Sequence, residues 1–481
     1  MTNKIKSFKE KVSSAKIAVL GLGISNIPLI RFLYSSGARD ITAYDKFSSP
    51  QVLANVDMLK KEGMIKKAVT GDNYLENIFS EKFDFIFKSP IIRPDEVNLV
   101  KAVEQGACLT SEMELFFELC PCKIYGVTGS DGKTTTTTLI YKLLSAHYKD
   151  SDTKVWLGGN IGRPLIDILP EIQSGDVAVL ELSSFQLLTM KKSPDISVIT
   201  NITPNHLDVH RDYEEYIEAK KNIITYQKDD GTVVLNAQND VTKRIALEYI
   251  AQSRKVRLFS VYKTEKAEFA EGAEGYAYMR EGVLEYVSGS KIFSIARSSL
   301  RVPGLFNAEN LLTAIAACAD VILQKDIENV VAEFTGVAHR CEFVRELNGV
   351  KFFNSSIDSS PNRTINTLSV FDGNIVMIAG GKDKNIPYDD VGPAICKKVK
   401  VLILVGPTSD KIEAAVRACE DFKEENLNIY RVNNYEDAVK CAYNSAIPGD
   451  YVLLSPASTS FDLFRNFEER GKIFKEIVLK L

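Results

Sequence analysis

Short apolar segments alternate with amphipathic segments along most of the chain. KIAVL, at residues 16–20, leads into a glycine turn and then into NIPLIRFLYSSGA, whose apolar residues recur at helical spacing. The same order of strand, turn and helix returns after KIYGVTG at 123–129 and after VKFFNSS at 350–356. Such alternation is typical of parallel sheets covered by helices. The pattern therefore predicts an α/β protein with three units of this kind.

One stretch departs from this alternation. Residues 256–302 are rich in strand and turn patterns and contain glycines at 272, 275, 282 and 289. A helix pattern, ENLLTAIAACADVIL, follows them. We find no short repeat and no low-complexity segment, so the three units are not copies of one repeat.

Composition and charge exclude several classes of protein. The 481 residues suffice for about three domains. A net charge of −4 argues against a sequence-independent nucleic-acid binder. Eight scattered cysteines without CxxC spacing favour free thiols in a reducing cytoplasm. The first residues lack the apolar core of a signal peptide, and no apolar run predicts a membrane span.

The stretch GVTGSDGKTTTTT, residues 126–138, carries the clearest chemistry. A glycine loop between a strand and a helix exposes backbone N–H groups where the helix dipole favours an anion. Lys133 can then reach nucleotide phosphates, and the Thr134 hydroxyl can join a Mg²⁺ shell. The alternative interpretation, without a functional role, is a strand–turn–helix junction with a surface lysine. Four of the five threonines have no separate explanation from the sequence.

Three further residues are candidates for the same edge of the predicted sheet. Glu181 ends the strand VAVLE, and His206 follows the strand ISVITNI, so both can bind a metal there, although either can be an ordinary surface residue. Asp212 and Glu215 predict a capping box that opens a helix. On that helix Lys220 falls on the largely apolar face, whereas Lys221 points about 100° away.

These motifs occur together in one known family. The order T-G-S-x-G-K-T resembles the ATP loop of the Mur ligases and of folylpolyglutamate synthetase. The segments GGNIGRP, ELSSFQL and LLSPASTSFDLFRNFEERG match its D-glutamate-adding members, and TGVAHRCE and GGKDK match motifs of the whole family, in the family's order. The resemblance covers nearly the whole chain.

The resemblance implies an ATP-dependent ligase of peptidoglycan synthesis, and hence of cell-wall biogenesis, cell shape and cell division. It would join D-glutamate to UDP-N-acetylmuramoyl-L-alanine through an acyl phosphate, with ATP and two Mg²⁺ ions. It would be a cytoplasmic monomer without nucleic-acid or membrane partners. The implied domains are a Rossmann-like UDP-substrate domain at 1–111, a P-loop ATPase-like domain with a mainly parallel sheet at 112–336, and a Rossmann-like amino-acid-binding domain at 337–481.

The family's functional positions can be carried over by motif. The catalytic residues would be Lys133, Glu181, His206 and Lys220, with Lys220 carbamylated. The metal ligands would be Thr134, Glu181, His206 and the carbamylated Lys220. ATP would contact Thr128, Gly129, Ser130, Asp131, Gly132, Lys133, Thr134, Thr135, Asn307, Asn310 and Arg340. The UDP substrate would contact Gly23, Ile24, Ser25, Asn26, Asp45, Lys46 and Asn160. The amino acid would contact Ser359, Lys384, Ser460, Phe461 and Phe467.

The chain also departs from the family's pattern. Val127 stands where the strict phosphate loop has its first glycine, and Phe306 stands where the family has a histidine. Ser355 and Ile357 replace an aspartate and a lysine that contact nucleotide, so either these contacts are missing or other side chains, such as Asp358, supply them. Ile91 replaces a glycine in KSPIIRP.

Two other classes of function are considered. GLGISN with Asp45 resembles a dinucleotide fingerprint, which would suit an NAD(P) oxidoreductase, but Asn26 occupies the third glycine position. A nucleotide switch or motor would use the phosphate loop alone. Another Mur ligase or a folylpolyglutamate synthetase-like enzyme is the alternative within the ligase class.

Overall fold

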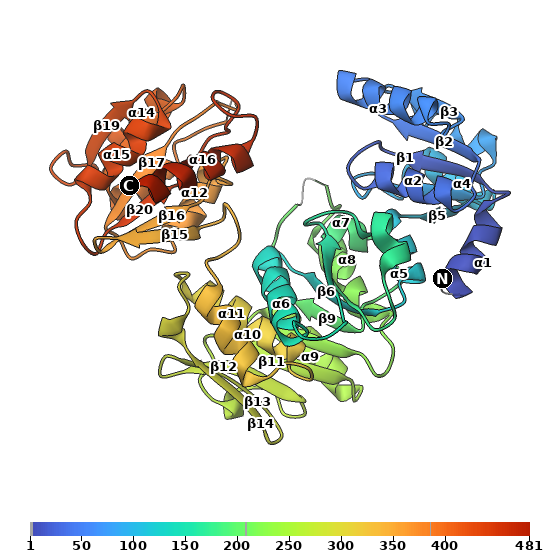
Figure 1. The fold of residues 1–481 in the computed structure, drawn as a ribbon, viewed down its shortest axis with the longest axis horizontal. Coiled ribbons are helices and arrows are strands. Elements are labelled where there is room, and N and C mark those ends of the chain that lie inside the picture. Colours follow the sequence, from blue (N-terminus) through green and yellow to red (C-terminus); the bar gives the residue numbers. More distant parts are fainter. Residues whose placement is uncertain (1–2, 207–208, 385) are drawn as a thin grey trace. The chain divides into compact units, whose positions relative to one another are not determined.

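The computed structural model describes residues 3–206, 209–384 and 386–481. The chain forms two compact units, Met1–Ile295 with Glu309–Glu328, and Ala296–Ala308 with Asn329–Leu481. The first unit contains two sheets and the second contains one (Figure 1). The predicted α/β class with parallel sheets is confirmed. The domain boundaries at 111 and 336 stay a prediction.

The sheet of the amino-terminal segment is entirely parallel, with strand order β3-β2-β1-β4-β5. The order reverses next to β1, and ligands bind at such a switch point in open α/β sheets. Its strands are β1 (Lys16–Leu20), β2 (Asp40–Asp45), β3 (Lys67–Thr70), β4 (Phe85–Lys88) and β5 (Cys108–Thr110). Its helices are α1 (Asn3–Val12), α2 (Asn26–Ser35), α3 (Pro50–Lys61) and α4 (Val97–Glu104), with the 3₁₀ helix η1 (Ile78–Glu81).

The second sheet of the first unit has the order β14-β13-β12-β11-β10-β9-β6-β8-β7. Its strands are β6 (Lys123–Thr128), β7 (Val155–Gly159), β8 (Val177–Glu181), β9 (Ile196–Ile199), β10 (Thr232–Asn236), β11 (Lys255–Ser260), β12 (Gly275–Arg280), β13 (Val283–Ser288) and β14 (Lys291–Ala296). Pairing is parallel from β7 to β12, and β12 pairs antiparallel with β13. The strand-rich reading of residues 256–302 is therefore confirmed.

Helices surround this central sheet (Figure 1). They are α5 (Glu112–Leu119), α6 (Lys133–His147), α7 (Ser184–Leu187), α8 (Tyr213–Thr225) and α9 (Asp240–Ala251), with η2 (Leu165–Glu171) and η3 (Lys266–Glu268). The helices α10 (Leu305–Cys318) and α11 (Gln324–Glu333) each have residues in both units, and η4 (Arg297–Ser299) belongs to the second unit. The central strands β6, β8 and β9 are almost wholly buried, which explains their continuous runs of apolar residues.

The second unit holds the sheet β15-β16-β20-β17-β18-β19, in which only the pair β15–β16 is antiparallel. Its strands are β15 (Glu342–Leu347), β16 (Val350–Asn354), β17 (Ile375–Ala379), β18 (Val399–Val405), β19 (Asn428–Val432) and β20 (Tyr451–Leu454). Its helices are α12 (Pro361–Leu368), α13 (Val391–Lys398), α14 (Ser409–Arg417), α15 (Tyr435–Ser445) and α16 (Phe467–Lys480). Buried apolar residues fill both faces of the sheet.

Two smaller expectations can be checked here. The eight cysteines are free thiols, as predicted. The capping box at α8 is only half formed: the Asp212 side chain accepts from the Glu215 N–H, but the Glu215 carboxylate accepts from the Arg211 N–H instead of from Asp212.

None of the described helices is long and apolar enough to span a bilayer.

Candidate active site

The candidate site lies at the carboxyl ends of three neighbouring strands. β6 lies between β9 and β8, and all three run parallel. Their last residues, Thr128, Glu181 and Ile199, therefore reach one edge of the sheet. This is the edge at which open parallel sheets bind their ligands.

The phosphate loop, residues 129–132, is held by the residues that follow β9. The Ser130 N–H donates to the Asn201 carbonyl oxygen at 2.9 Å, and the Asp131 N–H donates to the Asn201 side chain at 2.9 Å. The Thr200 hydroxyl donates to the Asp131 carbonyl oxygen at 2.5 Å. Gly129 has φ +152°, and a Cβ there would overlap the Thr200 hydroxyl. Only glycine fits at this approach of the two backbones.

Lys133 is the first residue of α6 and is half-buried. Its ammonium group donates to the carbonyl oxygens of Gly129 and Ser130 at 2.8 and 2.9 Å. The side chain thus curls back over the loop that precedes it. The first N–H groups of a helix have no partner within the helix, so this loop and the start of α6 together favour an anion.

The threonine run now has an explanation. Thr137 and Thr138 donate their hydroxyls to the carbonyl oxygens four residues earlier, at 2.8 and 2.7 Å. Thr136 donates to the Asn310 side chain at 3.2 Å, which joins α6 to α10. Thr135 is buried, whereas Thr134 is partly exposed beside the loop. Hydroxyls that satisfy backbone carbonyls offset the poor helix propensity of threonine.

Glu181 is 2% exposed and is fixed by the turn after β7. Asn160 donates its side-chain amide to Glu181 Oε1 at 3.0 Å, and the Asn160 N–H donates to the Glu181 carbonyl oxygen at 2.8 Å. The other carboxylate oxygen, Oε2, is buried and has no hydrogen-bond partner among the described residues. A buried anionic oxygen without a partner is costly unless a cation binds it, so this position fits a hard divalent metal.

Lys220 is 1% exposed, as its place on the apolar face of α8 predicted. Its amino group donates to the Gly129 carbonyl oxygen at 2.8 Å and lies 4.7 Å from the centre of the Tyr216 ring. Burial, with the nearby charge of Lys133, lowers the pKa of Lys220 to about 6. The amine is therefore uncharged at neutral pH. Lys221 instead forms an ion pair with Glu248 at 3.3 Å.

His206 is placed beside aromatic side chains. Its backbone has φ +55°, and its ring packs edge-on against Phe185 with ring centres 5.2 Å apart. Leu207 and Asp208, which complete the NHLD motif, lie outside the described residues. Among the residues that are described, no three His, Cys, Asp or Glu side chains form a group able to hold a metal. The metal roles of Thr134, Glu181, His206 and Lys220 stay predictions.

Sequence reasoning missed the side-chain contacts that support this edge. Ser130 shares a hydrogen bond of 2.9 Å with the Tyr216 hydroxyl, which joins the loop to α8. His210 stacks on Phe185 and contacts the Ser184 hydroxyl at 3.0 Å. Ser183 and Gln186 form a capping box that starts α7. The S-x-x-Q spacing could have revealed the capping box, but no pattern indicated His210.

The candidate UDP-substrate residues surround the turn between β1 and α2. Gly23, Ile24 and Ser25 precede α2, and Ile24 is strongly exposed. Asn26 stands where a dinucleotide fingerprint has its third glycine. Its side-chain amide donates to the carbonyl oxygens of Leu20 and Gly21 and so stabilises the turn. The Asp45 carboxylate accepts from the N–H groups of Leu22 and Phe47 at 2.7 and 2.9 Å. Lys46 is exposed beside it.

The second unit carries the candidate amino-acid residues. Ser460 is buried, whereas Phe461 and Lys384 are exposed. Ser359 is partly exposed, and Phe467 begins α16. Arg340 is exposed, and Asn307 donates to the Pro303 carbonyl oxygen at 2.6 Å.

Asp358 does not face solvent, contrary to what a nucleotide ligand would need. It is 3% exposed, and the Ser455 hydroxyl donates to its carboxylate at 2.7 Å. Ser355 is also buried, and its hydroxyl accepts from the Cys341 N–H. Asp358 would have to become exposed before it could contact a nucleotide.

Comparison with known proteins agrees with this geometry. The model of the Mur ligase middle domain matches residues 127–318, and that of the Mur ligase glutamate ligase domain matches residues 339–458. A protein of Acetivibrio thermocellus is 48% identical to this chain over 481 residues, with 99% of each chain covered. The chain belongs to the Mur ligase family, and the predicted ligase class is confirmed.

The more particular resemblance is confirmed as well. The Acetivibrio thermocellus relative is named UDP-N-acetylmuramoylalanine–D-glutamate ligase, as is a Ruminiclostridium cellulolyticum protein that is 45% identical over all of both chains. Solved structures share the fold. They include the UDP-N-acetylmuramate–alanine ligase MurC of Thermotoga maritima (TM-score 0.54, 19% identity, 97% of this chain and 99% of that one). They also include the MurF ligase of Thermotoga maritima in complex with ADP (TM-score 0.53, 17% identity, 100% of both).

Proposed function

We propose that this chain joins D-glutamate to UDP-N-acetylmuramoyl-L-alanine with the hydrolysis of ATP to ADP and phosphate. The observation that carries the proposal is the 48% identity to a D-glutamate ligase across 99% of the chain, the second unit included. Other members of the ligase class add other amino acids, so identity limited to the ATP-binding segment would not have supported a particular amino acid.

The phosphate loop and α6 would bind ATP. The loop N–H groups and the start of α6 supply a cradle for phosphate oxygens. Lys133 would exchange its two carbonyl partners for the outer phosphates, which are stronger acceptors because they are charged. Asn310 supports the loop through Thr136 and lies where the family places an adenine contact. Asn307 and Arg340 are proposed as further nucleotide contacts.

Lys220 would carry a carboxylate made from CO₂. A carbamate forms when an uncharged amine attacks CO₂, with formation of an N–C bond and loss of one proton. Burial supplies the uncharged amine, because it lowers the pKa of Lys220 to about 6. We propose that this carbamate, Glu181, His206 and Thr134 hold two Mg²⁺ ions. Bound Mg²⁺ would offset the charge of the triphosphate and the substrate carboxylate.

The reaction then needs two displacements at one place. The carboxylate of the UDP-linked substrate attacks the γ-phosphorus of ATP, the bond to ADP breaks, and an acyl phosphate forms. The amine of D-glutamate next attacks the acyl carbon, and phosphate leaves as the amide forms. Lys133 stabilises the moving phosphoryl charge, and Asn160 orients Glu181 beside the reacting groups.

The remaining assignments follow the family's pattern. We propose domains at 1–111, 112–336 and 337–481 for UDP-substrate, ATP and amino acid respectively. The turn at residues 23–26 would meet the diphosphate through backbone N–H groups, with Asp45 and Lys46 near the nucleoside. D-Glutamate would contact the second unit through Ser359, Lys384, Ser460, Phe461 and Phe467. The enzyme would act as a monomer in the cytoplasm.

The test is phosphate release from ATP in the presence of UDP-N-acetylmuramoyl-L-alanine and D-glutamate. We expect release only when both substrates are present. Lys133→Ala should abolish phosphate release, because it removes a charge that lowers the activation barrier of phosphoryl transfer by several kcal/mol. The loss of stability should be small, because Lys133 is only half-buried. Activity close to wild type in this variant would contradict the assignment of the ATP site.

A further inference from the structure

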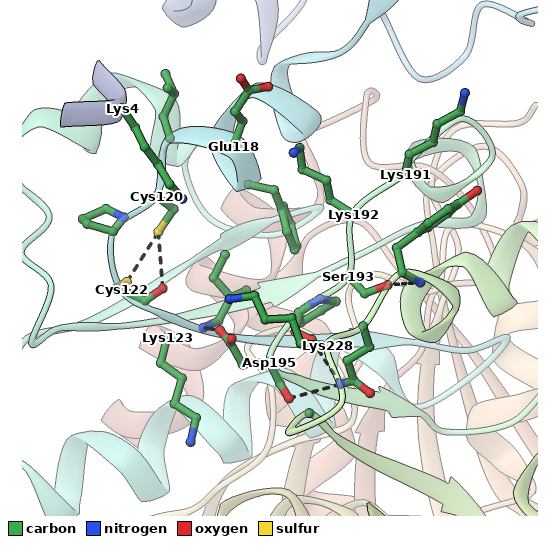
Figure 2. A pocket seen from close by; sticks show the side chains of 18 of the residues that line it. Lys4, Glu118, Cys120, Cys122, Lys123, Lys191, Lys192, Ser193, Asp195 and Lys228 are labelled. Atoms are coloured by element: carbon green, nitrogen blue, oxygen red, sulfur yellow. Dashed lines mark hydrogen bonds between the residues drawn. The ribbon is translucent and has the colours of Figure 1, made fainter. Parts of the chain in front are cut away.

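A cavity of about 950 Å³ lies at the opposite edge of the central sheet from the phosphate loop (Figure 2). It is lined where β6 begins at Lys123, by the segment 191–195 before β9, and by the turn before β10. Residues of α1 and the end of α5 complete its wall. Nothing in the ligase reaction uses this edge, since the substrates of that reaction bind where the same strands end.

The cavity is lined by an excess of positive charge. Its lysines are Lys4, Lys11, Lys123, Lys191, Lys192 and Lys228, and its carboxylates are Glu118, Asp195 and Asp230. Asp195 is already engaged, because its carboxylate accepts from the Ile124 N–H at 2.8 Å. Of these lysines, Lys4, Lys192 and Lys228 extend toward the hollow, whereas Lys123 and Lys191 extend away from it (Figure 2).

These lysines lack a close ion-pair partner among the described residues. Within the part of the chain that the structure describes, none of the six forms an ion pair. Lysines elsewhere in the same unit do pair: Lys16 and Lys67 contact Glu81, and Lys66 contacts Asp40. Ammonium groups gathered around one hollow repel each other, so an anion that binds among them lowers the free energy of the folded chain.

The shape of the cavity limits the kind of anion. Its volume is that of a site for a small molecule rather than for a single ion. Cys120 and Cys122 form a buried part of the wall, with their sulfur atoms 3.5 Å apart, and the Tyr226 ring is 46% exposed at the margin. Flexible ammonium groups bind phosphates as point charges, and an exposed aromatic ring can stack on a base.

We propose that this cavity binds a small anion with at least two phosphate groups. The anion can be inorganic, such as pyrophosphate, or it can be a nucleoside diphosphate whose base stacks on Tyr226. Both sources share the diphosphate that the lysines would contact. The proposal does not depend on the ligase activity, because it concerns binding at a separate edge of the sheet.

The test is lysine footprinting of the whole chain with an amine-reactive acetylating reagent, with the rate at each lysine measured by mass spectrometry while pyrophosphate is titrated. We expect the rates at Lys192 and Lys228 to fall at least fivefold with one common midpoint. The rate at Lys325, an exposed lysine of α11, should stay unchanged. Protection of Lys133 can occur with its own midpoint, because the phosphate loop also binds phosphates; reading each lysine separately keeps the two sites apart.

Variants make the test specific. Lys192→Gln combined with Lys228→Gln should raise the midpoint measured at Lys4 at least tenfold, whereas Lys325→Gln should leave it unchanged. Sodium chloride at matched ionic strength should not reproduce the protection. Equal protection by sodium chloride, equal protection of Lys325, or no protection at the cavity would each overturn the proposal.

A second titration identifies the source of the diphosphate. If ADP binds more tightly than pyrophosphate, and Tyr226→Ala raises the midpoint for ADP alone, the ligand is a nucleotide. If both compounds protect with similar midpoints and Tyr226→Ala changes neither, the ligand is an inorganic diphosphate. Either result supports a diphosphate site, and protection by neither compound contradicts it.

Discussion

The amino group of Lys220 lies 2.8 Å from the carbonyl oxygen of Gly129 and donates a hydrogen bond to it. Lys133 donates to the same oxygen at 2.8 Å. One lysine of helix α8 and one of helix α6 therefore donate to the same carbonyl oxygen of the phosphate loop. The first of these lysines is uncharged at neutral pH, so the pair avoids the repulsion that two buried ammonium groups would suffer.

Lys220 and Lys221 allow a matched test of this arrangement. We expect Lys220→Ala to lose at least a thousandfold in kcat, because the carbamate that it would carry is missing, and a short carboxylate in solution should restore part of the activity. Lys221→Ala should change kcat less than threefold, since Lys221 only pairs with Glu248 at the surface. Steady-state kinetics in bicarbonate buffer measure both. The reverse order of effects would contradict the assignment of Lys220.

Glu181 tests the metal assignment. Its buried Oε2 has no hydrogen-bond partner in the part of the chain that the structure describes, whereas Oε1 accepts from Asn160. Glu181→Gln keeps the shape of the side chain but removes the charge, so we expect the Mg²⁺ concentration for half-maximal activity to rise more than tenfold while the melting temperature stays equal or rises. An unchanged Mg²⁺ dependence would show that Glu181 is not a metal ligand.

Asp358 predicts a pH effect on stability. Burial raises the pKa of its carboxyl from 3.8 to about 6, so between these values the folded chain binds more protons than the unfolded chain. The contribution of Asp358 to the free energy of unfolding should therefore fall as the pH rises from 4 to 6. Asp358→Asn removes this titration but keeps an acceptor for Ser455.

The free energy of unfolding of Asp358→Asn minus that of the wild type should increase from pH 4.5 to pH 6.5, by up to about 3 kcal/mol, and then stay constant. Urea unfolding at each pH measures it. The KM for ATP should not change, because the Asp358 side chain is buried. A gain that shrinks as the pH rises would contradict the assignment of the buried carboxyl.

The amino-acid site is tested by substrate-specific kinetics. Lys384→Ala should raise the KM for D-glutamate about 10- to 100-fold, since a hydrogen bond to a charged group is worth about 1.5–3 kcal/mol. Ser460→Ala should raise it about fivefold, as expected for about 1 kcal/mol. The KM values for ATP and for the UDP substrate should stay the same. Lys397→Ala, an exposed lysine of the same unit, serves as the control.

If Lys384→Ala and Ser460→Ala lower only the melting temperature, their side chains support the fold and do not bind D-glutamate. Equal increases in all three KM values would point to a general disturbance of the second unit. Either outcome would contradict the assignment of these two residues.

Sequence patterns within single segments predicted the strands and helices of the site, because the spacing of apolar residues in each segment determines its secondary structure. Helical spacing predicted the burial of Lys220 on α8, and the glycine loop predicted the start of α6. Residues that act across strands could not be predicted in this way. Thr200 and Asn201 hold the phosphate loop from another strand, and spacing within one segment cannot show such a contact.

The same limit applies to the threonine run and to Asp358. The run was unexplained until α10 brought Asn310 to Thr136. Asp358 was a reasonable nucleotide ligand in the sequence, but the fold turns it toward Ser455 in the interior. In both cases the partner lies more than ninety residues away, so only the folded chain shows it.

The central claim is that this chain selects D-glutamate, and a competition assay tests it most directly. The purified wild-type protein would receive ATP, Mg²⁺, UDP-N-acetylmuramoyl-L-alanine and equal concentrations of D-glutamate, L-glutamate, L-alanine, L-lysine and diaminopimelate, and the amide product would be identified by mass spectrometry and chiral analysis. We predict that the D-glutamate adduct dominates. A product that contains any of the other amino acids as its main component would contradict the proposed function.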